Sequence, residues 1–288
     1  MRSATVSRWL PFSCVDGPGN RLVLFLQGCN FACPGCHNPH TIGLCDHCGD
    51  CVPGCPSGAL TLHEGRVSWQ AASCTDCDAC LDACPRSASP KTAVMTVAEV
   101  LALLRRYGPL LTGITVSGGE ATTQLPFVIA LFTAIKGAPD LAHLGCLLDS
   151  NGSLAEAGWQ RLLPVLDGAM IDLKGWGDAV HHMLTGYGRE RVLASLQLLA
   201  QAGKLAEVRL LQVPGQSDYL TADGRLEGGL AAFLHALGPV PIRLNGFRHH
   251  GVRGAAQGWS EAAREELEQL AAVLAVAGLG PVSLPPLL

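Results

Sequence analysis

The sequence predicts an α/β fold with a mainly parallel sheet, joined to a separate cysteine-rich segment. Two observations lead to this prediction. From residue 91 onward, short strand-like apolar runs alternate with helix-like runs, which is typical of parallel strands linked by right-handed crossovers. Residues 41–90 instead lack long apolar runs and are rich in Cys, Gly, Asp and Pro. Because this segment cannot bury much apolar surface, something other than a hydrophobic core must hold it together.

About six strands are expected, the first of them an apolar run that immediately precedes a cysteine motif. The predicted strands cover residues 22–27, 113–117, 144–148, 169–173, 207–213 and 242–244. The predicted helices cover residues 96–107, 125–136, 154–163, 189–202, 225–236 and 260–277. Thr96 can cap the first helix, with Glu99 completing a capping box. The periodicity fits an open sheet and a closed barrel equally well.

Polar residues gather where the predicted strands end, and parallel sheets bind their ligands at that edge. The residues are Cys29, Gly118, Glu120, Asp149, Asp172, Lys174 and Arg209. We therefore expect the functional site at the carboxyl ends of the strands.

The composition narrows the class of protein. The chain has 288 residues, of which 48% are hydrophobic and 15% charged, and its net charge is -4. These values exclude a disordered chain and a basic nucleic-acid-binding arm. The first residues do not resemble a signal peptide, and no apolar run reaches the ~18 residues of a membrane span. We expect a cytoplasmic protein with no membrane partner, whose 13 cysteines stay reduced and serve metal sites.

Eight cysteines between residues 45 and 84 form two copies of one motif. Each copy reads Cys-x2-Cys-x2-Cys-x3-Cys-Pro, the run found in bacterial ferredoxins. In that motif three thiolates bind one [4Fe–4S] cluster and the fourth binds the other. The prediction assigns Cys45, Cys48, Cys51 and Cys84 to one cluster, and Cys74, Cys77, Cys80 and Cys55 to the second. A pair of Cys₄ zinc sites is the alternative.

A third motif, Cys29-x3-Cys33-x2-Cys36, directly follows the first predicted strand. It supplies three thiolates for a cluster of four irons, so one iron would stay open to a ligand. An open metal position indicates a catalytic site rather than a structural one. The alternative is a zinc site completed by His37 or His40. Cys14 and Cys146 match no motif and are expected to be bystanders.

Several segments together resemble a known family. Cys-x3-Cys-x2-Cys after a strand is the signature of radical S-adenosylmethionine (SAM) enzymes. Residues 15–21 (VDGPGNR), 27–30 (QGCN) and 36–39 (CHNP) resemble the glycyl radical enzyme activases, the relatives of the pyruvate formate-lyase activating enzyme. Two ferredoxin-like motifs mark the longer activases of that group. Residues 247–254 (FRHHGVRG) are most similar to the YjjW-type activases.

The resemblance implies a fold and a reaction. Residues 1–40 and 91–288 would form the radical SAM core, a partial (β/α)6 TIM-like barrel. Residues 41–90 would form an inserted ferredoxin-like domain with two [4Fe–4S] clusters. A third, catalytic [4Fe–4S] cluster would reduce SAM and generate a 5′-deoxyadenosyl radical, which abstracts hydrogen from a backbone glycine of a partner glycyl radical enzyme. Flavodoxin or ferredoxin would supply the electron. The duplicated motif suggests that the inserted clusters relay this electron to the catalytic cluster; the alternative is that they form a docking surface for the partner.

The resemblance also assigns roles to single residues. Cys29, Cys33 and Cys36 would hold the catalytic cluster. Residues 35–37 would contact adenine, although Gly35 stands where many relatives carry an aromatic residue. Gly118, Gly119 and Glu120 would receive the SAM amino group, Lys174 its carboxylate, and Arg209 would help to hold it. Asp149 and Asp172 would form a monovalent-cation site. One of Arg248, His249 and His250 would contact the ribose, and His250 is favoured.

Two further expectations concern loops. Asp16 and the loop 17–19 would border the opening that admits the partner's glycine loop. His181 and His182 are expected to be solvated.

Three other functions remain open. A radical SAM enzyme acting on a small molecule would use the same cysteines, but the activase-like segments speak against it. A ferredoxin-like electron carrier would not need Cys29, Cys33 and Cys36. Zinc-dependent nucleic-acid binding is the most distant, because no basic stripe or aromatic platform is present.

Overall fold

The structure, a computed structural model, describes residues 2–252 and 254–285. Arg253, part of the YjjW-like segment, therefore lies outside the described residues. The chain divides by packing into a first unit of residues 1–30 and 38–144 and a second unit of residues 31–37 and 145–288. This division follows packing rather than motifs, so the predicted core and the predicted insert at 41–90 remain predictions.

Four strands of the first unit form one sheet in the order β5-β1-β2-β6. Only β2 and β6 run parallel; β1 is antiparallel to both of its neighbours. The strands are β1 (Ser3–Ser13), β2 (Arg21–Leu26), β5 (Ala93–Thr96) and β6 (Gly113–Gly118). The helices are α2 (Val97–Tyr107) and α3 (Leu125–Gly137). Strands β2 and β6 are buried along most of their length, which explains their continuous apolar sequences.

The loop that contains Asp16 joins two antiparallel strands. Strand β1 was not predicted, and it pairs antiparallel with β2, with Ser13 opposite Arg21 and Val6 opposite Leu26. Residues 14–20 therefore join the two strands at the amino end of β2. Cys29 follows the carboxyl end of the same strand, about 20 Å away for six residues of extended chain. The expectation that Asp16 and the loop 17–19 border the opening for the partner's glycine loop is not tested by this pairing and stays a prediction.

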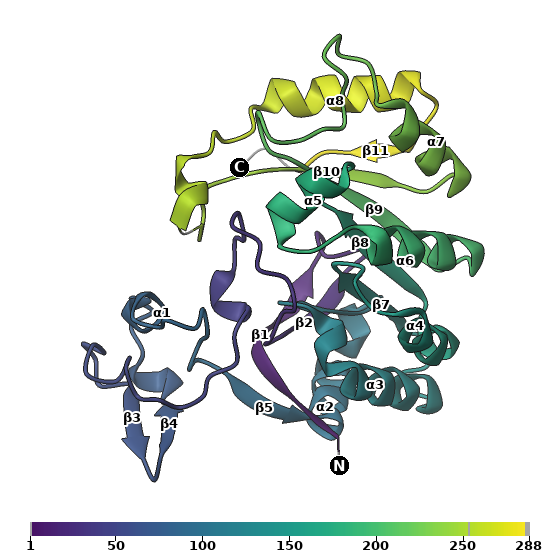
Figure 1. The fold of residues 1–288 in the computed structure, drawn as a ribbon. Helices are drawn as coiled ribbons and strands as arrows, with labels where there is room; N and C mark the ends of the chain where they lie inside the picture. The colour runs from purple at the N-terminus through teal and green to yellow at the C-terminus, as the bar shows by residue number, and fades with distance from the viewer. Residues whose placement is uncertain (1, 253, 286–288) are drawn as a thin grey trace. The chain divides into compact units, whose positions relative to one another are not determined.

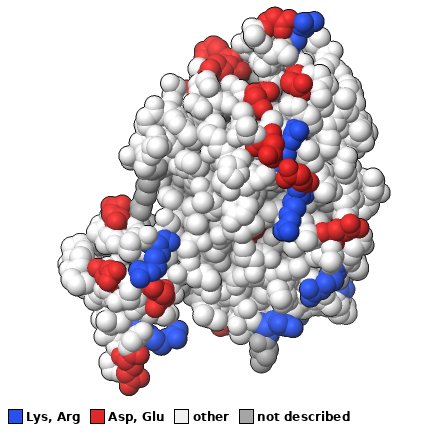
Figure 2. All heavy atoms as spheres, viewed as in Figure 1, with Lys and Arg blue, Asp and Glu red and all other residues white. Residues whose placement is uncertain are grey.

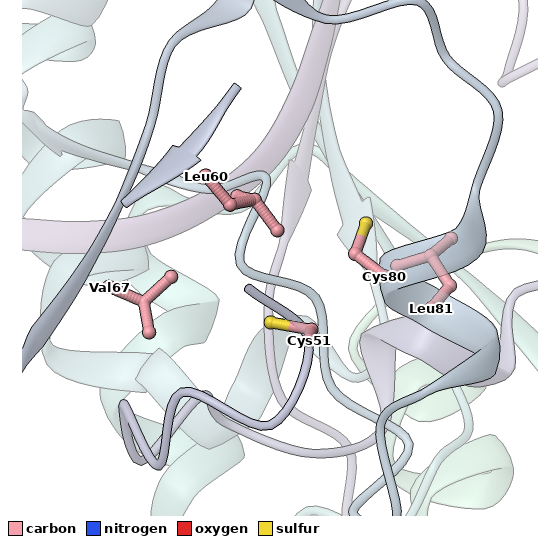
Figure 3. Packing of buried hydrophobic residues seen from close by; sticks show 5 residues of the cluster. All are labelled: Cys51, Leu60, Val67, Cys80 and Leu81. Carbon is pink, nitrogen blue, oxygen red and sulfur yellow. The ribbon is translucent and has the colours of Figure 1, made fainter. Parts of the chain in front are cut away.

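The cysteine-rich segment has little regular structure. It contains an antiparallel hairpin of β3 (Leu60–His63) and β4 (Arg66–Trp69), and the short helix α1 (Ala79–Asp82) (Figure 1). Its apolar cluster is small and consists of Cys51, Leu60, Val67, Cys80 and Leu81 (Figure 3). Two of its five buried members are cysteines predicted to bind iron. The small core agrees with the expectation that apolar burial alone does not hold this segment together.

The second unit contains five parallel strands in the order β7-β8-β9-β10-β11. They are β7 (Gly145–Ser150), β8 (Gly168–Leu173), β9 (Leu205–Gln212), β10 (Ile242–Gly246) and β11 (Val282–Ser283). The helices are α4 (Glu156–Leu162), α5 (Asp178–Thr185), α6 (Glu190–Gln201), α7 (Gly228–Ala236) and α8 (Arg264–Val276) (Figure 1).

All six predicted strands and all six predicted helices are confirmed, within a few residues at their ends. The capping box at Thr96 and Glu99 is confirmed as well, because each side chain bonds the other's backbone N–H. Helices α1 and α5 and strands β1, β3, β4, β5 and β11 were not predicted.

Charged side chains are interspersed on the face shown in Figure 2, which carries no continuous basic surface among the residues described. No helix in the described part of the chain is long and apolar enough to span a membrane.

Candidate functional site

Residues 31–37, which carry Cys33 and Cys36, are fastened to the end of helix α5. The backbone N–H of Ala32 donates to the carbonyl oxygen of Thr185 at 3.0 Å. The Phe31 ring stacks on Tyr187, with ring centroids 5.1 Å apart, and meets His181 edge-on at 6.0 Å. The cysteine loop is thus held by backbone and ring contacts rather than by its own turn alone.

His181 was expected to be solvated, and that expectation is wrong. Its side chain is fully buried, and Nδ1 lies 2.8 Å from the carbonyl oxygen of Tyr187. Burial lowers the pKa of His181. The sequence misled because helix α5, which turns this histidine inward, was not recognised.

Lys174 lies close enough to the two cysteines of this loop to influence them electrostatically. Burial raises the pKa of the Cys33 thiol to about 11, against the opposing effect of the Lys174 charge. Burial would lower the pKa of Lys174, but Asp172 and the thiols of Cys33 and Cys36 outweigh it and hold that pKa above its usual value. Cys33, Cys36 and Lys174 therefore lie near one another within the second unit.

Three partly buried ion pairs involve residues of β7, β8 and β9 and the residue that follows β8. Lys174 Nζ lies 2.6 Å from Asp172 Oδ2. Arg209 Nη1 lies 2.8 Å from Asp149 Oδ1, and its Nε lies 2.7 Å from Glu207 Oε1. These charged residues lie close together because Asp172 pairs with Arg209 in the register of the parallel strands β8 and β9. Glu207, which the sequence did not single out, helps to neutralise the arginine.

The space beside Gly35 is filled by aromatic side chains from another segment. A Cβ added at Gly35 would lie 3.0 Å from Cε2 of Phe247 and 3.3 Å from Cζ3 of Trp259. Phe247 is fully buried, and its ring contacts both Trp259 and His37, with centroids 5.6 and 6.5 Å apart. The aromatic residue expected in the sequence at position 35 is thus supplied in space by residues 247 and 259. Sequence patterns could not show this.

The three candidates for the ribose contact have different neighbours. The Arg248 guanidinium donates to the carbonyl oxygen of Ala262. His249 Nε2 lies 2.8 Å from the carbonyl oxygen of Trp259, and its backbone N–H donates to Glu261. Burial, together with the charges of Lys174 and His250, lowers the pKa of His37. The first two side chains therefore turn toward residues 259–262, whereas His250 lies near His37.

In the first unit, the residues around Cys29 are held by the end of β6. Gly118 has φ of +130°, which favours glycine, and a side chain there would overlap the backbone of Leu26. A Cβ at Gly119 would lie 2.5 Å from the carbonyl oxygen of Gly28, to which Glu120 donates its N–H at 2.8 Å. The backbone of Leu26 and Gly28, just before Cys29, therefore packs closely against Gly118 and Gly119, in the space that a side chain would need.

Glu120 is almost fully buried at 1% exposure. Its Oε1 accepts hydrogen bonds from the backbone N–H of Thr122 at 3.0 Å and from the Thr122 hydroxyl at 2.6 Å. These bonds fix the carboxylate at the carboxyl end of β6.

The eight cysteines of residues 45–84 line two small pockets. We call them the first and the second cradle. The first cradle contains Cys45, Cys48, Cys51 and Cys84. The second cradle contains Cys55, Cys74, Cys77 and Cys80. Each cavity therefore draws three cysteines from one motif and the fourth from the other.

Each cradle has one cation beside it. Arg86 Nη1 donates to Cys48 Sγ at 3.4 Å and its Nε pairs with Asp46 at 2.7 Å. Lys91 lines the second cradle and pairs with Asp78 at 2.7 Å. Within the described residues, no three His, Cys, Asp or Glu side chains are arranged to share one metal ion. In a cubane each thiolate binds a separate iron, so four thiols around one cavity fit a cluster.

The sequence model of the Radical SAM superfamily matches residues 23–219. The chain is 32% identical over 229 residues to the isethionate sulfite-lyase activating enzyme of Nitratidesulfovibrio vulgaris, covering 72% of this chain and 73% of the relative. It is 30% identical over 209 residues to the pyruvate formate-lyase-activating enzyme of Streptococcus mutans, covering 72% of this chain but only 64% of that relative. It is 28% identical over 236 residues to the choline trimethylamine-lyase activating enzyme of Oleidesulfovibrio alaskensis, covering 75% and 74%.

Solved structures show the same fold. QueE from Escherichia coli superposes with a TM-score of 0.53 at 13% identity, covering 99% of this chain and 95% of QueE. SuiB of Streptococcus suis, bound to its precursor peptide, gives a TM-score of 0.56 at 9% identity, covering 92% of this chain and 48% of SuiB. The fold agrees with both sequence findings, the family match over residues 23–219 and the 32% identity over 72% of the chain. These two sequence findings show that this protein is an enzyme of the Radical SAM superfamily.

Proposed function

We propose that this enzyme activates a partner glycyl radical enzyme. The observation that carries the proposal is the activase-like sequence around Cys29, Cys33 and Cys36, in a chain similar to several activating enzymes. When bound, the cluster and SAM supply one-electron cleavage of SAM to methionine and a 5′-deoxyadenosyl radical, which takes a hydrogen atom from a partner glycine. The protein's task is to bind, orient and shield these groups.

We propose that the second unit holds SAM as follows. The Lys174 ammonium binds its carboxylate by a charge-assisted contact, and the Lys174–Asp172 pair of 2.6 Å keeps the ammonium in place. Arg209 braces the neighbouring strand through Asp149. His250 takes the ribose contact, since Arg248 and His249 turn toward residues 259–262.

We propose further contacts to SAM and to a monovalent cation. Gly118, Gly119 and Glu120 receive the SAM amino group. Asp149 and Asp172 contribute oxygens to a monovalent cation, the class of ligand that such a cation prefers. The proposed core is a partial (β/α)6 barrel, and the proposed subgroup is the YjjW-type activases. Residues 35–37 contact the adenine of SAM.

We propose that residues 41–90 form a ferredoxin-like insert with two further [4Fe–4S] clusters, which makes three per chain. The two four-cysteine cradles support this proposal. Flavodoxin or ferredoxin is the proposed reductant. Because the thiols must stay reduced, the cytoplasm is the proposed compartment, and the reaction requires exclusion of oxygen.

The proposal is tested by reconstituting the full chain without oxygen and adding SAM, a reductant and a glycyl radical enzyme encoded beside it. We expect about twelve iron atoms per chain, four for each of three cubanes, and a glycyl radical doublet in the EPR spectrum of the partner. If SAM is cleaved but no candidate partner acquires the doublet, the enzyme acts on a small molecule instead.

Gly35 offers a separate prediction about the SAM site. In Gly35→Tyr the new ring must displace Phe247 or Trp259, and overpacking of this kind costs about 1–3 kcal/mol. We expect SAM affinity, measured by equilibrium binding, to fall roughly 5- to 150-fold if that cost falls on the bound state. The double variant Gly35→Tyr/Trp259→Ala should recover much of the loss, because the ring then occupies the vacated space. Equal affinity of the single and double variants would contradict this account.

A further inference from the structure

The loop that carries Cys29 is hydrogen-bonded to the start of the cysteine-rich segment. The backbone N–H of Gly28 donates to the carbonyl oxygen of Thr41, and that of Cys29 to Ile42, both at 2.8 Å. One residue further on, the N–H of Gly43 donates to the carbonyl oxygen of Ser87 at 2.8 Å. Residues 41–43 therefore connect Cys29 on one side with the segment that follows Cys84 on the other.

Gly43 makes this connection tight. A Cβ at position 43 would overlap the carbonyl oxygen of Arg86 and would lie 3.2 Å from that of Ser87. Gln27, which is 1% exposed, donates from its amide to the carbonyl oxygens of His40 and Gly43 at 2.6 and 2.7 Å. The contact is thus backbone against backbone, and a buried side chain from the end of β2 holds it in place.

This contact belongs to the first cradle. Cys45 follows Gly43 by two residues, and Cys84 precedes Arg86 by two. The main chain of Arg86 touches Gly43, whereas its guanidinium donates to Cys48 Sγ. One residue therefore contacts both the approach to Cys29 and a proposed cluster ligand.

The second cradle adjoins the first at a different place. Cys51 of the first cradle and Cys80 of the second belong to the same buried cluster, with Leu60, Val67 and Leu81 (Figure 3). The first cradle therefore adjoins both the Cys29 loop and the second cradle.

We propose that electrons reach the catalytic cysteines through the first cradle, across the contact of Gly43 with Arg86, and that the second cradle lies upstream. This inference rests on the three-cluster part of the proposed function. Each transfer moves one electron and neither makes nor breaks a bond: the donor cluster is oxidised from 1+ to 2+ and the acceptor reduced from 2+ to 1+. Reduced flavodoxin or ferredoxin supplies the electron. Because electron transfer slows steeply with distance, the tight contact at Gly43 is the favourable crossing.

Two variants distinguish the two cradles in the full, reconstituted enzyme. Arg86→Gln removes a positive charge and a hydrogen bond to sulfur beside the first cradle, and Lys91→Gln removes the charge beside the second. Both losses destabilise the reduced cluster, so each variant should make one reduction potential more negative. In an EPR-monitored titration, we expect each variant to shift a different signal, which assigns the two signals.

The assigned signals then test the order. The catalytic cluster is recognised because its spectrum changes when SAM is added. We expect its signal to be broadened by spin coupling to the signal that Arg86→Gln shifts, and the broadening to disappear in Cys48→Ala, which removes a first-cradle ligand. Coupling to the signal that Lys91→Gln shifts, surviving in Cys48→Ala, would overturn the inference.

A matched pair of glycines tests the crossing itself. Gly43→Ala forces the Arg86 carbonyl away, whereas Gly54→Ala places its methyl 3.8 Å from the nearest atom, the Cys51 carbonyl oxygen, in ordinary contact. With reduced flavodoxin as donor, freeze-quench EPR should show slower reduction of the catalytic cluster in Gly43→Ala only. Equal rates in both variants at full iron content would contradict the crossing. If Gly43→Ala does not fold, the coupling experiment still decides the order.

Iron content separates the two possible failures. A reconstituted chain with about four irons rather than about twelve would overturn the three-cluster proposal. A chain with about twelve irons and the wrong coupling partner would overturn only the proposed order.

Discussion

Replacing Cys33 by alanine is expected to abolish formation of the glycyl radical in the partner. Two thiolates cannot hold a cubane that is already short of one protein ligand, so the catalytic cluster is lost. The two proposed inserted clusters would use other cysteines and should remain, which predicts a fall from about twelve to about eight irons per chain. Iron analysis and EPR of the partner after incubation with SAM and reductant measure both effects.

The control for this prediction is Cys14→Ala. Cys14 is exposed and lies outside all three motifs, so its removal should change neither iron content nor activity. If Cys33→Ala keeps about twelve irons, or if Cys14→Ala loses four, the assignment of the catalytic ligands is wrong.

Replacing Arg209 by methionine is expected to destabilise the enzyme strongly. The Arg209 side chain is only 11% exposed and pairs with both Asp149 and Glu207. Its removal leaves two partly buried carboxylates without their cation, and breaking such a pair costs about 3–5 kcal/mol. For a chain of this size, we expect the thermal midpoint of the anaerobic holoenzyme to fall by on the order of 10 °C.

An exposed pair with the same chemistry is the control. Arg105 and Asp140 lie 2.7 Å apart, but their side chains are 51% and 53% exposed. Arg105→Met should therefore change stability by only about 0–1 kcal/mol. If Arg209→Met and Arg105→Met have similar thermal midpoints, burial does not make the Arg209 ion pairs more important for stability than the exposed pair.

Much of the fold follows from local patterns that tertiary contacts do not override. Buried parallel strands must be apolar along their length, so the runs at 22–27, 113–117 and 169–173 were recognisable. Thr96 and Glu99 begin a helix through bonds made within four residues. Strands β1 and β5 were missed because they lie at one side of the sheet of the first unit and are partly exposed, which weakens their apolar signal.

The candidate site was predictable where its chemistry requires fixed spacing. The motif around Cys33 and Cys36 could be found because thiolates must reach irons of one cluster within a short segment. Phe247 and Trp259 could not, since they approach Gly35 from more than 200 residues away. His181 could not either, because only the packing of α5 against Phe31 buries it.

The sequence by itself determined the superfamily signature, the alternation of strands and helices, and the division of eleven cysteines among three motifs, because these depend on residue type and short spacing. Tertiary structure alone decided which aromatic rings fill the space beside Gly35, that the two glycines at the end of β6 admit the protein's own backbone, and which cradle adjoins Cys29. Each of these depends on contacts between segments far apart in the chain, and periodicity and spacing carry no information about such contacts.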